Sequence, residues 1–330
     1  MRIAGYSVGI LATIWALIPA VLMARSASPV DGAGMTAPTE GRAILSDLRR
    51  SRSIHFTLYR DYEDDAYDQK LIFALEQNFS RLQREFWDFL PPRHREGHVE
   101  VVIFSSRERF DEFAAAESGV PHGETGYLST GADRMAFLRQ DEFHKDVTIA
   151  VHELVHVFNR WCTPYTPVWL DEGMAQYYSY FAAEEEGNES MPGGVNVAAL
   201  RMVDAALAAG QLPRIGTLIQ MDEAVFYGPG REINFAAAWA LVYYLRHGLG
   251  PDRDSLFTRM YSRLAQRGDP HRAFTWSYGA NMDMLQHFWL AYLERLYEEH
   301  REYIEVAVPV DEEEEPGNDA PAEVITPLRP

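Results

Sequence analysis

Cysteine is nearly absent from this sequence, because only Cys162 among its 330 residues carries a thiol. A single cysteine cannot form a disulfide within the chain, and it cannot supply a structural metal site built from several thiolates. We therefore expect Cys162 to be a buried residue, or one that merely lies near a functional site.

Basic charge is also scarce. The chain has 30 Lys and Arg residues against 49 Asp and Glu residues, which gives a formal net charge of −19. Nucleic acid is therefore not an expected partner, because neutralising phosphates requires a basic surface. The sequence also contains no Gly-rich phosphate loop and no internal repeat. Its hydrophobic fraction of 47% is sufficient for a large core in one or two domains.

One apolar segment carries a pair of histidines. Residues 152–156 read His-Glu-Leu-Val-His, and the surrounding residues 147–158 are mostly apolar. Residues four apart lie on one face of an α-helix, so His152 and His156 can direct a ring nitrogen each at a single metal ion. Glu153 lies one position around the helix, where a general base for a metal-activated water belongs. The alternative is a core helix with two hydrogen-bonded histidines and a surface glutamate.

A carboxylate that would complete a metal site follows in the next segment. Residues 167–173 read Pro-Val-Trp-Leu-Asp-Glu-Gly, and Glu172 lies sixteen residues after His156. A second helix is expected over residues 168–180, and its return over the first helix would bring Glu172 to the histidines. Two histidines, a glutamate and one open position are typical of a catalytic Zn²⁺ site. The alternative for Glu172 is a helix-start acid favoured by the helix dipole.

These two segments together resemble the gluzincin clan of metallopeptidases. The resemblance is closest to bacterial peptidase-MA-like families, in which H-E-x-x-H is followed by W-L-x-E-G-x-A, and it covers about residues 100–250. It implies a zinc peptidase whose metal ligands are His152, His156 and Glu172. It also implies that Glu153 is the general base, which takes a proton from water and passes it to the leaving amine.

Two positions depart from the family pattern. The families often have a tyrosine where this chain has Phe235, and its hydroxyl would stabilise an oxyanion. Tyr227 is a candidate for that role because it lies beside Gly-Pro-Gly, a loop that could approach the metal. Other candidates are Tyr243, Tyr244 and His247. The second departure is Gln176, which stands where relatives carry an acid that orients a ligating histidine; it can accept a hydrogen bond but supplies no charge.

The patterns predict an α+β fold, with a mixed sheet before the motif helix and a mostly helical half after it. Strands are expected over residues 53–59, 98–104 and 134–139, and a loop over 123–131. Helices are expected over residues 64–90, 106–117, 196–209, 235–247, 254–266 and 281–303. The resemblance implies a zincin-like fold in which residues 134–139 form the sheet edge that pairs with an extended peptide. The alternative is an ordinary buried strand.

The ends of the chain have distinct compositions. Arg2 precedes an apolar stretch over residues 3–24, which is typical of a signal peptide or an N-terminal membrane anchor. Either interpretation places the folded part outside the cytoplasm. Residues 25–41 are expected to be a flexible linker, residues 42–306 the metallopeptidase domain, and residues 307–330 a disordered acidic tail.

The sequence therefore predicts an extracytoplasmic, secreted or membrane-anchored zinc metallopeptidase acting on peptides or proteins. One alternative is a catalytically weak metal-binding protein that holds peptides or a cell-envelope partner in the same cleft. Another is a zinc hydrolase that cuts a non-peptide amide. Among the remaining histidines, His144 is the one whose position, two turns before His152, could place it in the cleft.

Overall fold

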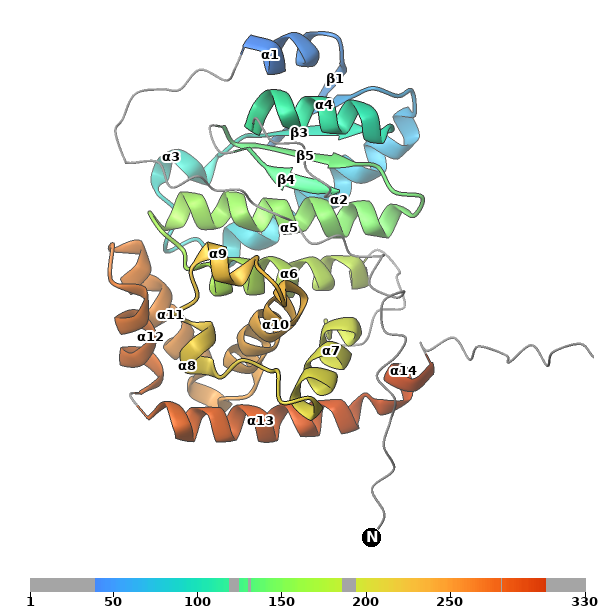
Figure 1. Ribbon diagram of the computed structural model, residues 1–330. Helices are drawn as coiled ribbons and strands as arrows, with labels where there is room; N and C mark the ends of the chain where they lie inside the picture. The colour runs from blue at the N-terminus through green and yellow to red at the C-terminus, as the bar shows by residue number, and fades with distance from the viewer. Residues whose placement is uncertain (1–38, 119–124, 130–131, 186–193, 280, 307–330) are drawn as a thin grey trace, which may run out of the picture.

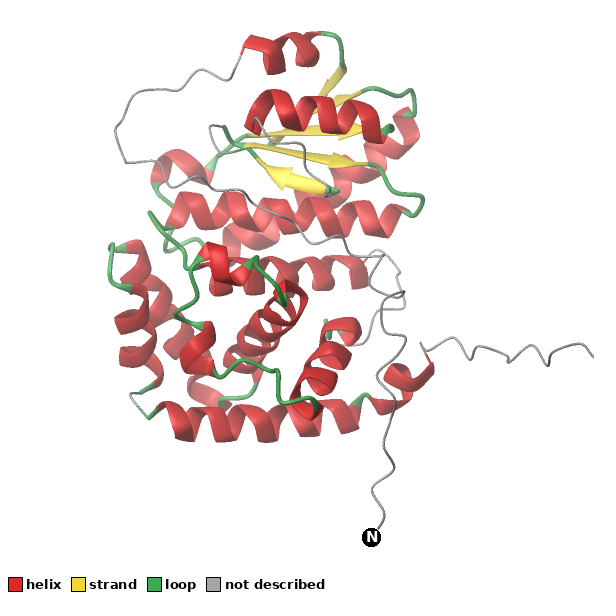
Figure 2. Cartoon of the chain, viewed as in Figure 1, coloured by secondary structure: helices red, strands yellow, loops and turns green. Residues whose placement is uncertain are grey.

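The chain divides into a sheet-containing half and a helical half, which meet at helices α5 (Phe143–Cys162) and α6 (Val168–Glu185) (Figure 1). The computed structural model describes residues 39–118, 125–129, 132–185, 194–279 and 281–306. Within these residues the strands form one five-stranded mixed sheet and most of the rest is helical (Figure 2). The predicted α+β class is confirmed.

The sheet has the strand order β1-β2-β3-β5-β4. Its strands are β1 Arg49–Arg52, β2 Phe56–Arg60, β3 Val99–Phe104, β4 Gly126–Leu128 and β5 Arg134–Leu138. The three central strands are parallel, whereas β1 and β4 run antiparallel to their neighbours. The strand predicted over 98–104 is confirmed as β3. The strand predicted over 53–59 overlaps β2, but β1 was not predicted because its sequence, Arg-Arg-Ser-Arg, has no apolar alternation.

The prediction that residues 134–139 form the sheet edge is wrong. They form β5, which pairs with β3 on one side and with β4 on the other. β4 lies inside residues 123–131, which were expected to be a loop, and it pairs with β5 through Gly126 and Phe137. Three residues are too few to show the alternating pattern of a strand. On this side the sheet therefore ends at β4.

Each face of the sheet packs into its own core, because successive side chains of a strand point to opposite faces. The sheet-containing half also contains the helices α1 Thr39–Ser46, α2 Asp65–Glu85, α3 Pro92–Arg95 and α4 Arg107–Ser118. In β3, Val101 and Ile103 belong to the core that contains α2 and α5, whereas Val102 belongs to the core that contains α1 and α4. Figure 1 shows α4 on one side of the sheet and α5 on the other.

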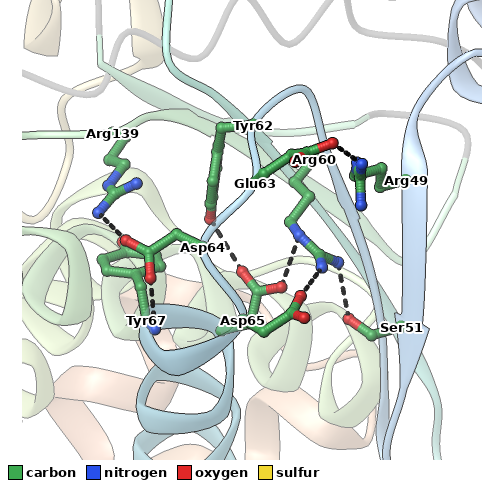
Figure 3. A network of polar contacts seen from close by, with 10 residues as sticks. Arg49, Ser51, Arg60, Tyr62, Glu63, Asp64, Asp65, Tyr67 and Arg139 are labelled. Carbon is green, nitrogen blue, oxygen red and sulfur yellow. Dashed lines mark hydrogen bonds and ion pairs between the residues drawn. The ribbon is translucent and has the colours of Figure 1, made fainter.

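Ion pairs connect the end of β2 to the start of α2 (Figure 3). Arg60 lies with its Nε 2.6 Å from Asp68 Oδ2 and with its Nη2 2.6 Å from Asp65 Oδ1. The hydroxyl of Tyr62 donates to the other oxygen of Asp68 at 3.3 Å. Arg60 and Asp68 are both buried, so each charge is compensated by the other inside the fold.

A second set of contacts connects this region to the start of α5. Arg139 lies 3.0 Å from Asp64 and its guanidinium carbon is 3.9 Å from the centroid of the Tyr67 ring. The hydroxyl of Tyr67 donates to Asp146 Oδ2 at 2.5 Å, and the backbone N–H of Gln140 donates to Asp146 Oδ1 at 2.8 Å. Burial raises the pKa of Asp146 to about 6, although both hydrogen bonds oppose that rise.

The helical half contains four of the predicted helices and three that were not predicted, and the helix predicted over 281–303 is divided into α13 and α14. Its elements are α7 Val197–Ala208, α8 Ile215–Leu218, α9 Glu223–Phe226, α10 Arg231–His247, the 3₁₀ turn Gly250–Asp252, α11 Arg253–Ala265, α12 Pro270–Tyr278, α13 Met282–Glu299 and α14 Arg301–Val306. α7, α10, α11 and α13 correspond to the predictions. The unpredicted α8, α9 and α12 are at most nine residues long, so they carry little helical periodicity.

Helices α6 and α10 approach each other closely at Gly173. A Cβ at this position would lie 2.6 Å from the carbonyl oxygen of Ala238 and 2.7 Å from Val242 Cγ2. Only glycine therefore fits between the two helices. The contact fixes the helical half against the turn of α6 that contains Glu172.

Most of the predictions for the chain ends lie outside the described residues. These are the apolar segment 3–24, residues 25–38 of the linker and the tail 307–330. The linker prediction is wrong for its last three residues, because α1 begins at Thr39. No helix within the described residues is long and apolar enough to span a membrane.

Candidate metal centre

Helix α5 places the two histidines of the motif side by side in the interior. His152 and His156 are one turn apart, their ring centroids are 4.9 Å apart, and both are buried. The middle turns of α5 are mostly apolar and buried, and the cores of both halves of the molecule pack against them. Two imidazoles in such surroundings need partners for their ring nitrogens.

A short turn returns the chain so that α6 lies against α5. The hydroxyls of Thr163 and Thr166 are 2.5 Å apart, and the carbonyl of Pro167 accepts hydrogen bonds from the N–H groups of the first turn of α6. This geometry brings Glu172 Oε2 to 3.3 Å from His152 Nε2 and to 3.7 Å from His156 Nε2. The predicted return of the second helix is therefore observed.

The three side chains form a group that could hold a metal ion. One ligand atom from each of His152, His156 and Glu172 lies within 4.8 Å of the other two. These atoms are buried, and among the described residues none has a hydrogen bond of normal geometry. A cation would satisfy all three lone pairs at once, and two imidazole nitrogens with one carboxylate oxygen form a donor set suited to a transition metal or zinc.

Asp171 orients one of the histidines. Its Oδ1 lies 2.9 Å from His156 Nδ1, which leaves Nε2 of the ring on the side that faces Glu172. Asp171 was not among the site residues predicted from the sequence, although it lies next to Glu172. Gln176, the position considered for this role, instead donates to the carbonyl of Phe235 at 3.2 Å and accepts from Asn196 at 3.4 Å.

The two histidines have opposite electrostatic surroundings. Burial lowers the pKa of His152, and this effect outweighs its contact with Glu172. Burial also lowers the pKa of His156, but the charges of Asp171 and Glu172 more than offset it and raise that pKa to about 9. The carboxylates thus make the His156 side of the group strongly attractive to positive charge.

Glu153 lies beside this group and directly under the sheet edge. Its side chain is fully buried. A Cβ on Gly126 of β4 would lie 3.3 Å from Glu153 Oε1 and 2.6 Å from Ile149 Cγ2. Glycine at position 126 therefore leaves the space in which the edge strand passes over the Glu153 carboxylate.

Tyr227 reaches the same group from the helical half. Its hydroxyl donates to Glu172 Oε1 at 2.6 Å, and its ring packs 5.9 Å from that of Phe235. Tyr227 caps α9, and the following turn passes through Gly230 with φ of +88°, a conformation that favours glycine. The loop beside Tyr227 thus approaches the site, as the sequence suggested.

The other candidate side chains have contacts elsewhere. His247 Nε2 is 2.9 Å from the hydroxyl of Tyr177, and Tyr243 and Tyr244 pack against Tyr292 at the same end of α10. His144 lies at the start of α5, 3.3 Å from Glu142. Cys162 is buried, as expected, and burial raises its pKa to about 12.

No family model matches this chain, and no curated protein matches it either. The case for a function therefore depends on the sequence motifs and on the geometry of the site.

Proposed function

We propose that this protein is a zinc-dependent metallopeptidase of the gluzincin type with a zincin-like fold. The observation that carries the proposal is the convergence of His152, His156 and Glu172, with Glu153 buried beside them. A metal site of purely structural role is closed by four protein ligands, whereas three leave a position open for water or substrate. A structural site would also have no use for the Glu153 carboxylate.

Zinc is the proposed ion because two imidazoles and one carboxylate match its usual catalytic ligands. When bound, it supplies a Lewis acid that lowers the pKa of water and polarises a carbonyl group. The neighbouring residues orient the side chains that would bind it. Asp171 holds the Nδ1 proton of His156, and Tyr227 donates to the Glu172 oxygen that does not face the histidines.

Glu153 is the proposed general base. It accepts a proton from the attacking water and passes it to the nitrogen of the leaving amine. Its side chain is buried, so the proton exchange is shielded from bulk water.

Tyr227 is the proposed hydroxyl donor for the oxyanion that develops on the scissile carbonyl. Because a hydroxyl has one proton, the donor would turn from Glu172 Oε1 to the oxyanion when substrate is bound. Its ring lies beside Phe235, the position at which the related families often have a tyrosine. The hydroxyl is therefore supplied from a neighbouring element. A donor aimed at a developing negative charge contributes more in a buried site than it would in water.

The proposed substrate is an extended peptide that pairs with the edge of the sheet. The edge strand is β4 and not β5, so the pairing would run along residues 126–128, directly over Glu153. The apolar segment at residues 3–24 supports an extracytoplasmic location, as a cleaved signal or as an anchor.

Turnover of peptides tests the proposal. Full-length protein loaded with zinc is incubated with a diverse peptide library, and cleavage is read by mass spectrometry, with Glu153→Gln in parallel. Cleavage by the wild type alone supports the assignment and reveals the specificity. If the folded, zinc-loaded wild type cleaves no peptide, the peptidase assignment is wrong, and a binding role or a non-peptide amide substrate is favoured instead.

A further inference from the structure

A chain of buried polar contacts, two hydrogen bonds and one ion pair, leads from helix α11 to His156. The hydroxyl of Tyr261 donates to Asn159 Oδ1 at 2.8 Å, and Asn159 Nδ2 donates to Asp171 Oδ1 at 2.7 Å. The same oxygen of Asp171 lies 2.9 Å from His156 Nδ1. None of the four residues is more than 4% exposed.

The direction of these bonds is fixed by the chemistry of the groups. The carboxylate of Asp171 can only accept, so the NH₂ group of Asn159 must face it and the amide oxygen must face Tyr261. Turning the amide over would place its oxygen against the carboxylate. Asp171 Oδ1 therefore accepts from Asn159 and also lies 2.9 Å from His156 Nδ1, so the imidazole is oriented with its Nε2 on the side of Glu172.

The far end of the chain of bonds is anchored by aromatic packing. The ring of Tyr261 lies 5.5 Å from that of Phe86 and 4.8 Å from that of Phe89, in the turn that ends α2. Burial raises the pKa of Tyr261 well above its usual range, so its hydroxyl keeps its proton and remains a donor. The packing of the ring therefore holds the Tyr261 hydroxyl in position beside Asn159.

We propose that Tyr261 and Asn159 are positioning residues of the metal centre. They hold the Asp171 carboxylate in place, and Asp171 orients His156 and precedes Glu172 at the start of α6. Two of the three ligands are thereby fixed before an ion binds, which lowers the ordering cost of binding. The inference rests on the proposed function, in which His156 and Glu172 ligate zinc.

Zinc affinity and ligand-field spectra test this role in the full-length protein. The variants are Tyr261→Phe, which removes only the hydroxyl, and Asn159→Leu, which removes both polar groups at similar volume. The control is Tyr178→Phe, because Tyr178 is buried and packs against Phe86, yet its hydroxyl is not part of this chain of bonds. Zinc dissociation constants are measured by competition with a chromophoric chelator, and visible absorption is recorded for Co²⁺-loaded protein.

Removal of outer-shell partners of zinc ligands typically costs about 10- to 100-fold in affinity. We expect Tyr261→Phe to raise the zinc dissociation constant by about 10-fold and Asn159→Leu by nearer 100-fold. Both should alter the Co²⁺ spectrum, while Tyr178→Phe should match the wild type in both measurements.

The outcomes separate this role from the proposed function. Wild-type affinity and spectrum in Tyr261→Phe and Asn159→Leu would overturn the positioning role, as would an equal loss in Tyr178→Phe. If the wild type binds zinc and cleaves peptides in that case, only the positioning role fails. If the wild type binds no zinc, the proposed function fails with it. If Tyr261→Phe does not fold, the zinc affinity and Co²⁺ spectrum of Asn159→Leu test the positioning role.

Discussion

Two buried polar clusters in this protein differ in how their charges are balanced. Between the end of β2 and the first turn of α2, Arg60 is paired with Asp68, so cation and anion are both supplied by the chain. In the metal-centre group, Glu172 faces two histidines and Tyr227, and within the described residues it has no Lys or Arg partner. The first cluster needs no further charge, although removing either partner would leave a buried charge uncompensated. In the second, two carboxylates face His156, and two imidazoles with a carboxylate are a donor set typical of a site that binds a metal cation.

The largest expected effect is at the ligands. Glu172→Gln keeps the shape of the side chain but removes its charge, so zinc should be lost at micromolar protein concentrations. Peptide cleavage should then fall toward the uncatalysed rate, a loss of about 10⁶-fold or more if the whole acceleration needs the ion. Metal analysis after gel filtration and a cleavage assay check this. A variant that keeps wild-type zinc content and activity would remove Glu172 from the ligand set.

Removing a cation from the balanced cluster should affect stability and not metal binding. Arg60→Ala leaves the buried carboxylate of Asp68 without its partner, so the free energy of unfolding should fall by about 3–5 kcal/mol. The measurement is urea denaturation of the zinc-loaded protein together with a zinc titration of the folded variant.

The matched control is Arg214→Ala, because Arg214 pairs with Asp283 on the surface, where both side chains are mostly exposed. Its unfolding curve should match that of the wild type. Equal losses of stability in the two variants would contradict the distinction between buried and surface pairs. Loss of zinc affinity in Arg60→Ala would contradict the independence of the two clusters.

Asp146, at the start of α5, should make the stability of the fold depend on pH. Its pKa of about 6 in the folded protein exceeds the ordinary value of 3.8, so the folded state binds the proton more tightly and stability falls as pH rises between these values. Relative to Asp146→Asn, the wild type should lose up to about 3 kcal/mol from pH 4 to pH 7, since one pKa unit corresponds to about 1.4 kcal/mol.

Denaturation of the wild type and Asp146→Asn at a series of pH values measures that difference. The free energy of unfolding of the wild type, relative to that of Asp146→Asn, should decline between about pH 4 and pH 6 and be constant at higher pH. A difference that rises with pH would mean that the hydrogen bonds from Tyr67 and Gln140 outweigh burial and keep Asp146 ionised.

The smallest expected effect is at Tyr227. Tyr227→Phe removes a donor to Glu172 and the proposed donor to the oxyanion, so kcat/KM should fall by about 10- to 100-fold while zinc remains bound. Tyr244→Phe is the control, because Tyr244 is buried at the other end of α10. Unchanged kcat/KM in Tyr227→Phe would exclude the hydroxyl from catalysis.

The metal-ligand group was predictable because its geometry follows from short-range periodicity. Residues four apart on a helix share a face whatever else the chain does, so His152 and His156 could be placed together from the sequence. Glu172 could be placed beside the two histidines because only a turn separates the second helix from the first. The approach of Tyr227 to the site was suggested by the glycines of its loop.

The orienting contacts were not predictable in the same way. Asn159 and Asp171 are polar residues in apolar helices, and nothing in the sequence says that their side chains meet or that Tyr261, far along the chain, joins them. The sheet edge was misplaced for a related reason, since β4 is too short to show a pattern and its position depends on pairing with β5. Long-range pairing of short or polar segments is decided by the whole fold.

The central claim is that His152, His156 and Glu172 bind one zinc ion and leave a position open. Crystals of the zinc-loaded protein, measured on both sides of the zinc absorption edge, test it most directly. The account predicts a single strong anomalous peak about 2.0–2.2 Å from the two Nε2 atoms and a Glu172 oxygen, without a fourth protein ligand. A peak at another site, no peak, or a fourth protein ligand would contradict the account.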